Sequence, residues 1–407
     1  MAALQAAPMA SLCEPCEGST LPPTGGLFRL PRGAITPIYT AEMIPCPKIP
    51  DWGGFLDRPS LASPAHNILQ GLREAPVLVI GAAGSIGSAL AARIAALDPP
   101  RLVLLDASEN DLHSLQRQWA GAGLTVPTEF RLGSAGDRAL LEEIFALHSP
   151  GLVFHAGAFK HVPLLEEQPL AAMENNIFGT LSLMEAAAGA RVVLLSTDKA
   201  VAPASVMGAT KRVAEQIVLS AGGTALRLGN VLASRGSVVE VFAGQIAAGG
   251  PLCLTDPAAS RYFVTLEEAV GLLLSAALEL EPPVLLAPAL PAAHRIADLA
   301  RFMIRELAGD LPIAVRQTGL RAGDKAGEQF WSPPETPQAA QAGDLIAITS
   351  PLPTQGRLRS VLARLRSALD ARDLAAALDH LQALVPDYTP SETLRALLAG
   401  GPRRVPA

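Results

Sequence analysis

The chain has 407 residues, of which 49% are hydrophobic and 17% charged, a composition typical of a folded globular protein. A formal net charge of -6 and an aromatic content of 4% argue against nucleic acid as a partner, because nucleic acid requires broad basic surfaces. No stretch reaches the about 20 apolar residues that a membrane-spanning helix needs, and no basic residue precedes an apolar run at the N-terminus. We therefore expect no membrane insertion, no secretory signal and a cytoplasmic location.

The N-terminal segment has no helical or strand periodicity. Residues 1–52 mix Pro, Gly, Ser and Thr, so this segment is predicted to be a flexible leader. It contains Cys13, Cys16 and Cys46 but no His. A closed structural zinc site needs four ligands, so we predict no metal site.

From residue 76 onward, short apolar runs alternate with amphipathic segments. This alternation predicts βαβ units and an α/β fold with a doubly wound Rossmann parallel sheet of six strands. The predicted strands are 76–80, 101–106, 128–132, 151–156, 191–196 and 225–230, and the predicted helices between them are 85–96, 109–122, 137–148, 169–188 and 207–220.

A glycine-rich turn follows the first predicted strand and opens a helix. Glycines at 81, 84 and 87 permit a tight turn and close backbone approach, and the helix N-terminus offers free N–H groups to a pyrophosphate. Asp106 ends the second strand, where a carboxylate can bind both ribose hydroxyls, and no Arg follows at once. The pattern therefore favours NAD over NADP. The predicted cofactor-binding residues are Gly81, Ala83, Gly84, Ser85, Ile86, Gly87, Asp106, Ser108, Ala156, Lys160, Asn176 and Lys211.

The alternation fades after residue 230. We therefore predict an NAD-binding Rossmann domain at 53–230 and a smaller C-terminal substrate-binding region at 231–355, followed by a helical C-terminal tail at 356–407. The NAD-binding domain includes His155, which follows an apolar run and is interpreted as a packed core histidine.

Candidate chemical groups gather at the end of the fifth predicted strand. Thr197, Asp198 and Lys199 place a hydroxyl, an acid and a base side by side, and Met207 and Lys211 lie one turn apart on the next helix. Both segments reach the carboxyl edge of a doubly wound sheet, where such folds bind their ligands. We predict these five residues as the catalytic set.

Several sequence motifs indicate a more specific class of enzyme. The segments HAGAFKHVPLLEEQP (155–169), STDKAV (196–201), SVMGATKR (205–212), RLGNVLASRGSVV (227–239) and GLRAGDK (319–325) together resemble the UDP-N-acetylglucosamine 4,6-dehydratases. These enzymes form a polysaccharide-biosynthesis branch of the extended short-chain dehydrogenase/reductases. The chain is most similar to members that carry Met in place of the usual catalytic Tyr. Large members have an N-terminal membrane region, and this chain resembles only their soluble catalytic part.

The resemblance implies a redox-neutral lyase reaction in which NAD borrows a hydride. The hydride leaves sugar carbon 4, a proton leaves carbon 5, the carbon 6 hydroxyl departs as water, and the hydride returns to carbon 6. By the family pattern, Asp198 protonates the leaving hydroxyl, Lys199 takes the carbon 5 proton, Lys211 binds the nicotinamide ribose and Thr197 orients the carbon 4 hydroxyl. Met207 is a wall of the site, because a thioether accepts no proton.

A UDP-sugar also needs donors for its diphosphate. Arginine offers paired donors of suitable geometry, and the expected substrate-binding residues are Asn230, Arg235, Arg261 and Arg321. Two alternatives remain. One is a nucleotide-sugar 4-epimerase, which has no leaving hydroxyl for Asp198 to protonate; the other is a non-catalytic NAD-binding regulator, motivated by the missing Tyr. A homo-oligomer is expected by analogy with the fold.

Overall fold

A computed structural model describes residues 50–61, 64, 73–187, 189–278, 283–340 and 344–400, all within one compact unit. Almost all of the predicted leader, including Cys13, Cys16 and Cys46, lies outside the described residues. Its end is described: Asp51 accepts a hydrogen bond from the Gly54 N–H at 3.2 Å and caps helix α1 (Trp52–Leu56). No described helix has the length and hydropathy required to cross a membrane.

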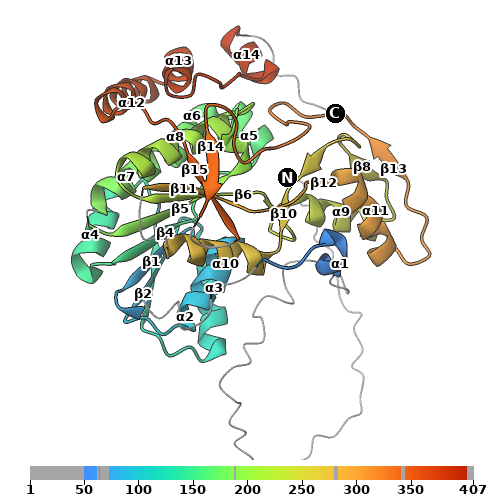
Figure 1. Ribbon diagram of the computed structural model, residues 1–407, viewed down its shortest axis with the longest axis horizontal. Coiled ribbons are helices and arrows are strands. Elements are labelled where there is room, and N and C mark those ends of the chain that lie inside the picture. Colours follow the sequence, from blue (N-terminus) through green and yellow to red (C-terminus); the bar gives the residue numbers. More distant parts are fainter. Residues whose placement is uncertain are drawn as a thin grey trace, which may run out of the picture. The chain divides into compact units, whose positions relative to one another are not determined.

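A nine-stranded sheet forms the centre of the fold, in the order β14-β15-β11-β6-β5-β4-β1-β2-β3 (Figure 1). The first six strands are parallel neighbours in the order 3-2-1-4-5-6, which confirms the predicted doubly wound Rossmann sheet. A further parallel strand and two antiparallel strands extend it beyond β6. The strands are β1 (Val77–Ile80), β2 (Leu102–Asp106), β3 (Thr128–Leu132), β4 (Leu152–His155), β5 (Arg191–Thr197), β6 (Thr224–Leu228), β11 (Val284–Pro288), β14 (Thr336–Ala339) and β15 (Leu345–Thr349).

Helices cover both faces of this sheet. Strands β1 and β4 are buried along their whole length, as expected for parallel strands with covered faces. One face packs against α2 (Ser85–Ala95), α3 (Glu109–Ala122) and α10 (Leu266–Ala277), and the other against α4 (Arg138–His148), α7 (Gly179–Ala186) and α8 (Val206–Ser220) (Figure 1). Strands β11, β14 and β15 thus belong to the main sheet and helix α10 packs on it, although all four lie within the predicted segment 231–355.

The rest of that segment builds a smaller lobe with its own apolar core. Phe55 of α1 packs there against Phe263 and Phe302, with ring centroids 5.8 and 5.2 Å away. The lobe begins directly after β6, so it adjoins the carboxyl edge of the sheet. Its other elements are β7 (Asn230–Val231), α9 (Val238–Ala247), β8 (Leu252–Leu254), β9 (Ser260–Arg261), β10 (Phe263–Val264), β12 (His294–Arg295), α11 (Ile296–Leu307) and β13 (Val315–Gln317).

The C-terminal segment is helical, with α12 (Gln355–Asp370), α13 (Leu374–Leu384) and α14 (Glu392–Leu398). Its apolar residues share a core with α8 and with the short helices α5 (Val162–Glu167) and α6 (Pro169–Met173). Figure 1 shows α12 and α13 as an outer layer above α8. The division into domains at residues 230 and 355 itself remains a prediction.

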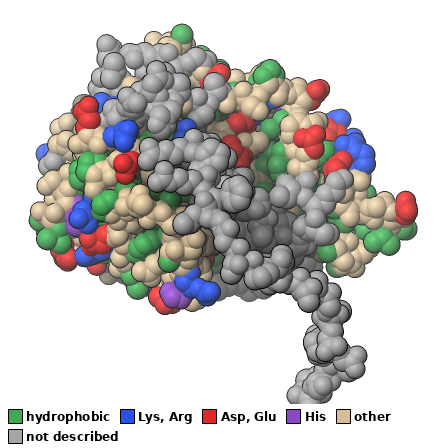
Figure 2. Space-filling model, turned by 90° about the horizontal axis from the view of Figure 1, so that it is seen from below, with side chains coloured by type: hydrophobic (Ala, Val, Ile, Leu, Met, Phe, Trp, Pro, Cys, Tyr) green, Lys and Arg blue, Asp and Glu red, His purple; other side chains and the backbone are tan. Residues whose placement is uncertain are grey.

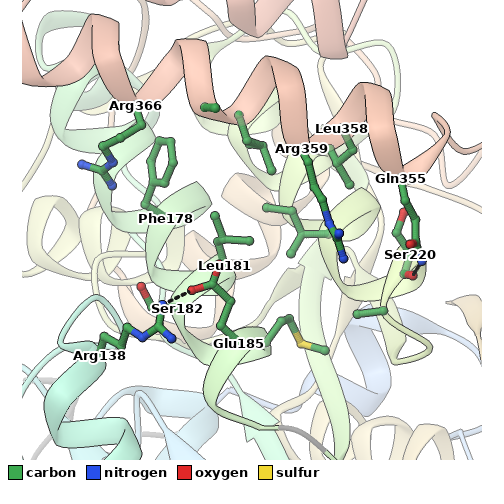
Figure 3. A pocket seen from close by; sticks show the side chains of 15 residues that line it. Arg138, Phe178, Leu181, Ser182, Glu185, Ser220, Gln355, Leu358, Arg359 and Arg366 are labelled. Carbon is green, nitrogen blue, oxygen red and sulfur yellow. Dashed lines mark hydrogen bonds and ion pairs between the residues drawn. The ribbon is translucent and has the colours of Figure 1, made fainter.

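A hollow of about 700 Å³ lies between α7, the end of α8 and α12. In Figure 3, Arg366 extends over the Phe178 ring, and Arg138 is paired with Glu185. Ser220 in its wall is about 20 Å along α8 from Met207, at 1.5 Å per residue, so this hollow is separate from the carboxyl edge. On the face drawn in Figure 2, acidic and basic side chains are interspersed.

Candidate active site

The glycine-rich turn has the close packing that the sequence predicts. Gly81 has a φ of +77°, and a Cβ there would lie 2.5 Å from the Gly157 nitrogen. A Cβ on Gly87 would lie 2.0 Å from the Gly81 oxygen, so only glycine fits at either position. Gly84 is the N-cap of α2, and Ser85 and Ile86 form its first turn. The backbone N–H groups at this helix start are therefore available to an anion.

Asp106 lies beside this turn at the end of β2. Its Oδ2 accepts a hydrogen bond from the Ala83 N–H and its Oδ1 accepts one from the Ser108 N–H, both at 2.8 Å. These bonds fix the carboxylate while leaving lone pairs for ribose hydroxyls. The Ser108 hydroxyl itself caps α3 by accepting from the Asp111 N–H at 3.4 Å, so its side chain has a structural role.

The loop after β4 closes the same turn from the other side. Ala156 is joined to β1 by its N–H, which donates to the Ile80 oxygen at 2.9 Å. Asn176 holds this loop: its Oδ1 accepts from the Phe159 N–H at 2.9 Å, and its Nδ2 donates to the Phe159 oxygen and to Thr210 Oγ1, both at 3.1 Å. All three hydrogen bonds of the Asn176 amide therefore go to other residues of the protein. The amide supports this loop, whereas the sequence predicts that Asn176 contacts the cofactor directly.

Arg235 lies against the start of α2, and Lys160 contacts Arg235. The Arg235 N–H donates to Ser85 Oγ at 3.0 Å, and its guanidinium donates to the Ala83 oxygen and pairs with Asp111 at 2.5 Å. Lys160 Nζ donates to the Arg235 oxygen at 2.7 Å, and burial together with the Arg235 charge lowers the pKa of Lys160. Arg235, predicted as a substrate residue, is therefore placed on the glycine-rich turn.

The acid–base pair forms at the end of β5. Lys199 Nζ donates to Asp198 Oδ1 at 3.0 Å and to Asn230 Oδ1 at 3.1 Å, and Thr197 Oγ1 also donates to Asp198 Oδ1 at 3.0 Å. Asp198 is fully buried, and its Oδ2 has no hydrogen-bond partner within the described part of the chain. The Lys199 side chain is 22% exposed. These hydrogen bonds join Thr197, Asp198, Lys199 and Asn230 in one cluster.

Helix α8, which carries Met207 and Lys211, packs against the turn that carries this pair. A Cβ on Gly208 would lie 2.2 Å from the Lys199 oxygen, so the first turn of α8 packs directly on the Asp198–Ala200 turn. Met207 is buried in an apolar cluster. Lys211 is also buried. Burial lowers its pKa to about 8, although the negative charge of Glu215 acts to raise it. Over the described ranges, Lys211 Nζ makes no hydrogen bond, which leaves its protons for a ligand.

The two remaining predicted substrate arginines are engaged elsewhere. Arg261 donates to the backbone oxygens of Ser260 and Lys325, both at 2.7 Å, and to that of Ala326 at 3.2 Å. Its Nη1 and Nη2 groups therefore fasten the 325–326 turn. Arg321 is exposed and pairs with Asp324 at 2.8 Å.

Glu328 is a site residue that the sequence analysis missed. It is buried, pairs with Lys325 Nζ at 2.6 Å, and lies within the electrostatic reach of Asp198 and Lys199. Burial raises its pKa, and the charge of Lys199 opposes that rise. Glu328 comes three residues after the GLRAGDK motif, in irregular structure without a periodic pattern. Its neighbours include Asp324, Lys325 and Gln329, so a further acidic residue there gives no distinctive sequence signal.

The chain is similar in sequence to a known protein family and to several of its members. A family profile described as "Polysaccharide biosynthesis protein" matches residues 77–350. The probable polysaccharide biosynthesis protein EpsC of Bacillus subtilis is 38% identical over 287 residues, which are 68% of this chain and 48% of EpsC. The chain thus spans about half the length of this curated relative.

Two further proteins are similar. The UDP-glucose 4-epimerase of Rickettsia canadensis is 32% identical over 297 residues, covering 69% of this chain and 83% of that enzyme. The crystal structure of DesIV, a dTDP-glucose 4,6-dehydratase from Streptomyces venezuelae with NAD and TYD bound, superposes with a TM-score of 0.55 at 20% identity, covering 62% of this chain and 87% of that one. At that identity the likeness shows a common fold.

Proposed function

The chain belongs to the polysaccharide biosynthesis protein family, as its motifs predict, and from this we propose that it is an NAD-dependent 4,6-dehydratase of UDP-N-acetylglucosamine. The product is a 4-keto-6-deoxy sugar for surface polysaccharide or glycan synthesis. One observation carries the proposal: Asp198 and Lys199 are joined at 3.0 Å at the end of β5. Elimination needs an acid and a base together, whereas epimerisation has no leaving hydroxyl to protonate.

The residues around the glycine-rich turn fit a dinucleotide. The space that a Cβ on Gly81 would fill lets the backbone approach a pyrophosphate, and Arg235 and Lys160 add positive charge at the start of α2. Asp106 then binds the adenosine ribose in this proposal, and Lys211 binds the nicotinamide ribose. NAD, when bound, supplies the chemistry of accepting a hydride from carbon 4 and returning it to carbon 6.

The protein residues then manage the protons. Thr197 orients the carbon 4 hydroxyl, Lys199 removes the carbon 5 proton, and Asp198 protonates the carbon 6 oxygen so that water leaves. Met207 accepts no proton, so the proton of the carbon 4 hydroxyl passes to a water, to Asp198 or to Lys211. Asn230 accepts a hydrogen bond from Lys199 Nζ at 3.1 Å and lies at the same edge of the sheet as this pair.

A nucleotide-sugar 4-epimerase is the second candidate, and the similarity to the Rickettsia canadensis enzyme favours it. Such an enzyme uses the same fold and the same hydride step without elimination. A non-catalytic NAD-binding regulator is the third reading, and it predicts cofactor binding without turnover.

Mass spectrometry of UDP-N-acetylglucosamine incubated with the full chain and NAD separates these candidates. The dehydratase converts it to a product lighter by one water, and Asp198→Asn and Lys199→Ala lose this product while retaining NAD binding. Thr128→Ser, on β3 away from the pair, is the control and keeps the wild-type rate. A product of unchanged mass but altered stereochemistry establishes the epimerase instead.

A further inference from the structure

The loop formed by residues 233–237 connects the end of the main sheet to the smaller lobe. It follows β7 and leads into α9, whose Val239 belongs to the apolar core of the lobe. Ala233 and Gly236 have φ values of +55° and +68°, so the chain turns sharply twice within these five residues. The contacts of Arg235 at the centre of the loop show where these turns bring it.

Arg235 fastens the 233–237 loop onto the start of α2. Its N–H donates to Ser85 Oγ at 3.0 Å, and Ser85 is the first residue of this helix. Its guanidinium donates to the Ala83 oxygen and pairs with Asp111 of α3 at 2.5 Å. One residue is thus bonded to the glycine-rich turn, to the start of α2 and to the neighbouring helix.

The loop after β4 also holds the 233–237 loop. Lys160 Nζ donates to the Arg235 oxygen at 2.7 Å. A Cβ on Gly236 would lie 2.7 Å from Cε1 of His161, so the backbone packs directly on that ring. Because the first N–H groups of a helix bind a pyrophosphate, the 233–237 loop is fastened at the place where we expect NAD to enter and leave.

The polar contacts of Arg235 are of a kind that can open. The side chains of Arg235 and Asp111 are 36% and 42% exposed, and an exposed ion pair is a weak interaction. The loop itself lies between packed elements, α9 on one side and the strands of the sheet on the other. Such a loop moves more readily than the elements that it connects.

We propose that Arg235 is a latch that controls the entry and release of NAD. While Arg235 is paired with Asp111, the 233–237 loop stays on the start of α2, and NAD passes only when this pair is open. This inference rests on NAD binding at the glycine-rich turn and goes beyond the proposed reaction. Under that reaction the cofactor returns its hydride in every cycle and has no need to leave, so slow exchange is compatible with turnover.

The direction of the rate changes distinguishes a latch from a simple effect of charge. Asp111→Asn weakens the latch, so the cofactor is expected to associate and dissociate faster by a similar factor, about threefold to fivefold, with Kd little changed. If Asp111 acted only through its negative charge, its loss would slow the release of the anionic cofactor. In Arg235→Met the latch predicts faster association, whereas the loss of a positive charge alone predicts slower association.

Stopped-flow fluorescence of NADH measures both rates in the full chain. Excess NAD displaces bound NADH and gives the dissociation rate, and the dependence on NADH concentration gives the association rate. The matched controls are Asp298→Asn and Arg301→Met, which break an exposed pair of 2.6 Å on α11. Both controls are expected to keep the wild-type rates.

Amide hydrogen exchange tests the latch in the absence of cofactor. The Arg235 N–H is bonded to Ser85 Oγ while the loop is closed, so its exchange reports how often the loop opens. We expect the peptide that contains Arg235 to exchange about threefold to fivefold faster in Asp111→Asn. The same peptide is expected to exchange at the wild-type rate in Asp298→Asn.

NADH release that is unchanged or slower in Asp111→Asn would overturn the inference. So would slower association in Arg235→Met, or exchange of the Arg235 N–H that is unchanged in Asp111→Asn. A protein that binds NADH but leaves UDP-N-acetylglucosamine unaltered contradicts the proposed reaction, and the NADH rates then still decide whether Arg235 is a latch.

Discussion

Lys211 is a buried cation with an unusual titration. Its pKa is lowered to about 8 by burial, so it changes charge close to neutral pH. Below about pH 8 it is an ammonium with three donors, and above it becomes a neutral amine that holds a ribose hydroxyl and an anionic cofactor more weakly.

We expect the Kd for NAD to rise as pH increases through 8. Calorimetric titration at about pH 7 and about pH 9.5 measures the change. In Lys211→Arg the guanidinium stays charged over this range, so the Kd for NAD is expected to be the same at both pH values. An equal rise in the wild type and in Lys211→Arg would show that another group is responsible.

His155 is the opposite case, a histidine kept neutral by the fold. It is 2% exposed and lies 3.2 Å from Thr180 Oγ1, which confirms the interpretation of a core residue. Burial and the charge of Lys211 lower its pKa to about 3. The unfolded chain binds a proton at His155 below about pH 6.5 and the folded chain does not, so folding stability falls as pH decreases from about 6.5 toward 3.

The expected contribution is about 1.4 kcal/mol per pH unit within that window. Urea unfolding of the wild type and of His155→Gln at about pH 7 and about pH 5 isolates it, because the variant lacks this dependence. Parallel pH dependences in the two proteins would contradict the assignment.

At the scale of elements, α8 is joined to β6 and to the segment before β14 by a buried ionic network. Arg227, fully buried, pairs with Glu215 and Glu335, each at 2.8 Å. Ser196 Oγ donates to Glu215 Oε1 at 2.6 Å, which connects the network to β5 just before Thr197. The pKa of Glu335 is lowered to about 2: burial opposes this shift, and the hydrogen bond and charge of Arg227 outweigh it.

Arg227→Met removes the fully buried one of the two arginines that Glu215 and Glu335 share, and leaves both carboxylates with Arg212. We expect a loss of about 3–5 kcal/mol in the free energy of unfolding. Arg295→Met is the control, because Arg295 is 60% exposed and pairs with Asp298, and exposed pairs contribute about 0–1 kcal/mol. Similar losses in both variants would show that the network does not stabilise the fold.

The local sequence pattern was sufficient to predict the strands, helices and glycine-rich turn of the site. It was insufficient to predict which side chains contact one another. The glycine spacing and the end of β5 predict where Gly81, Asp198 and Lys199 lie, because parallel strands all end at one edge. The partners of Arg235 and Arg261 could not be predicted, since each is set by segments more than 60 residues away. Glu328 was missed for the same reason.

At the scale of the whole molecule, the predicted sheet is correct through β6 and continues further than the pattern indicates. Strand β14 reads TPQA and is exposed at every position, so it has no apolar period, and its Pro337 is tolerated because the strand lies at the edge of the sheet. The tail helices α12 and α13 cover α8, and their amphipathic sequence indicates a buried face without identifying its partner.

The central claim is that one site moves a hydride from carbon 4 to carbon 6 while Asp198 and Lys199 expel water. The most direct measurement incubates UDP-N-acetylglucosamine carrying deuterium at carbon 4 with the full chain and NAD, followed by mass spectrometry and NMR of the product. The account predicts a product lighter by one water that retains the deuterium at carbon 6. An intact hexosamine with deuterium still on carbon 4, as isomer or unchanged substrate, would contradict it.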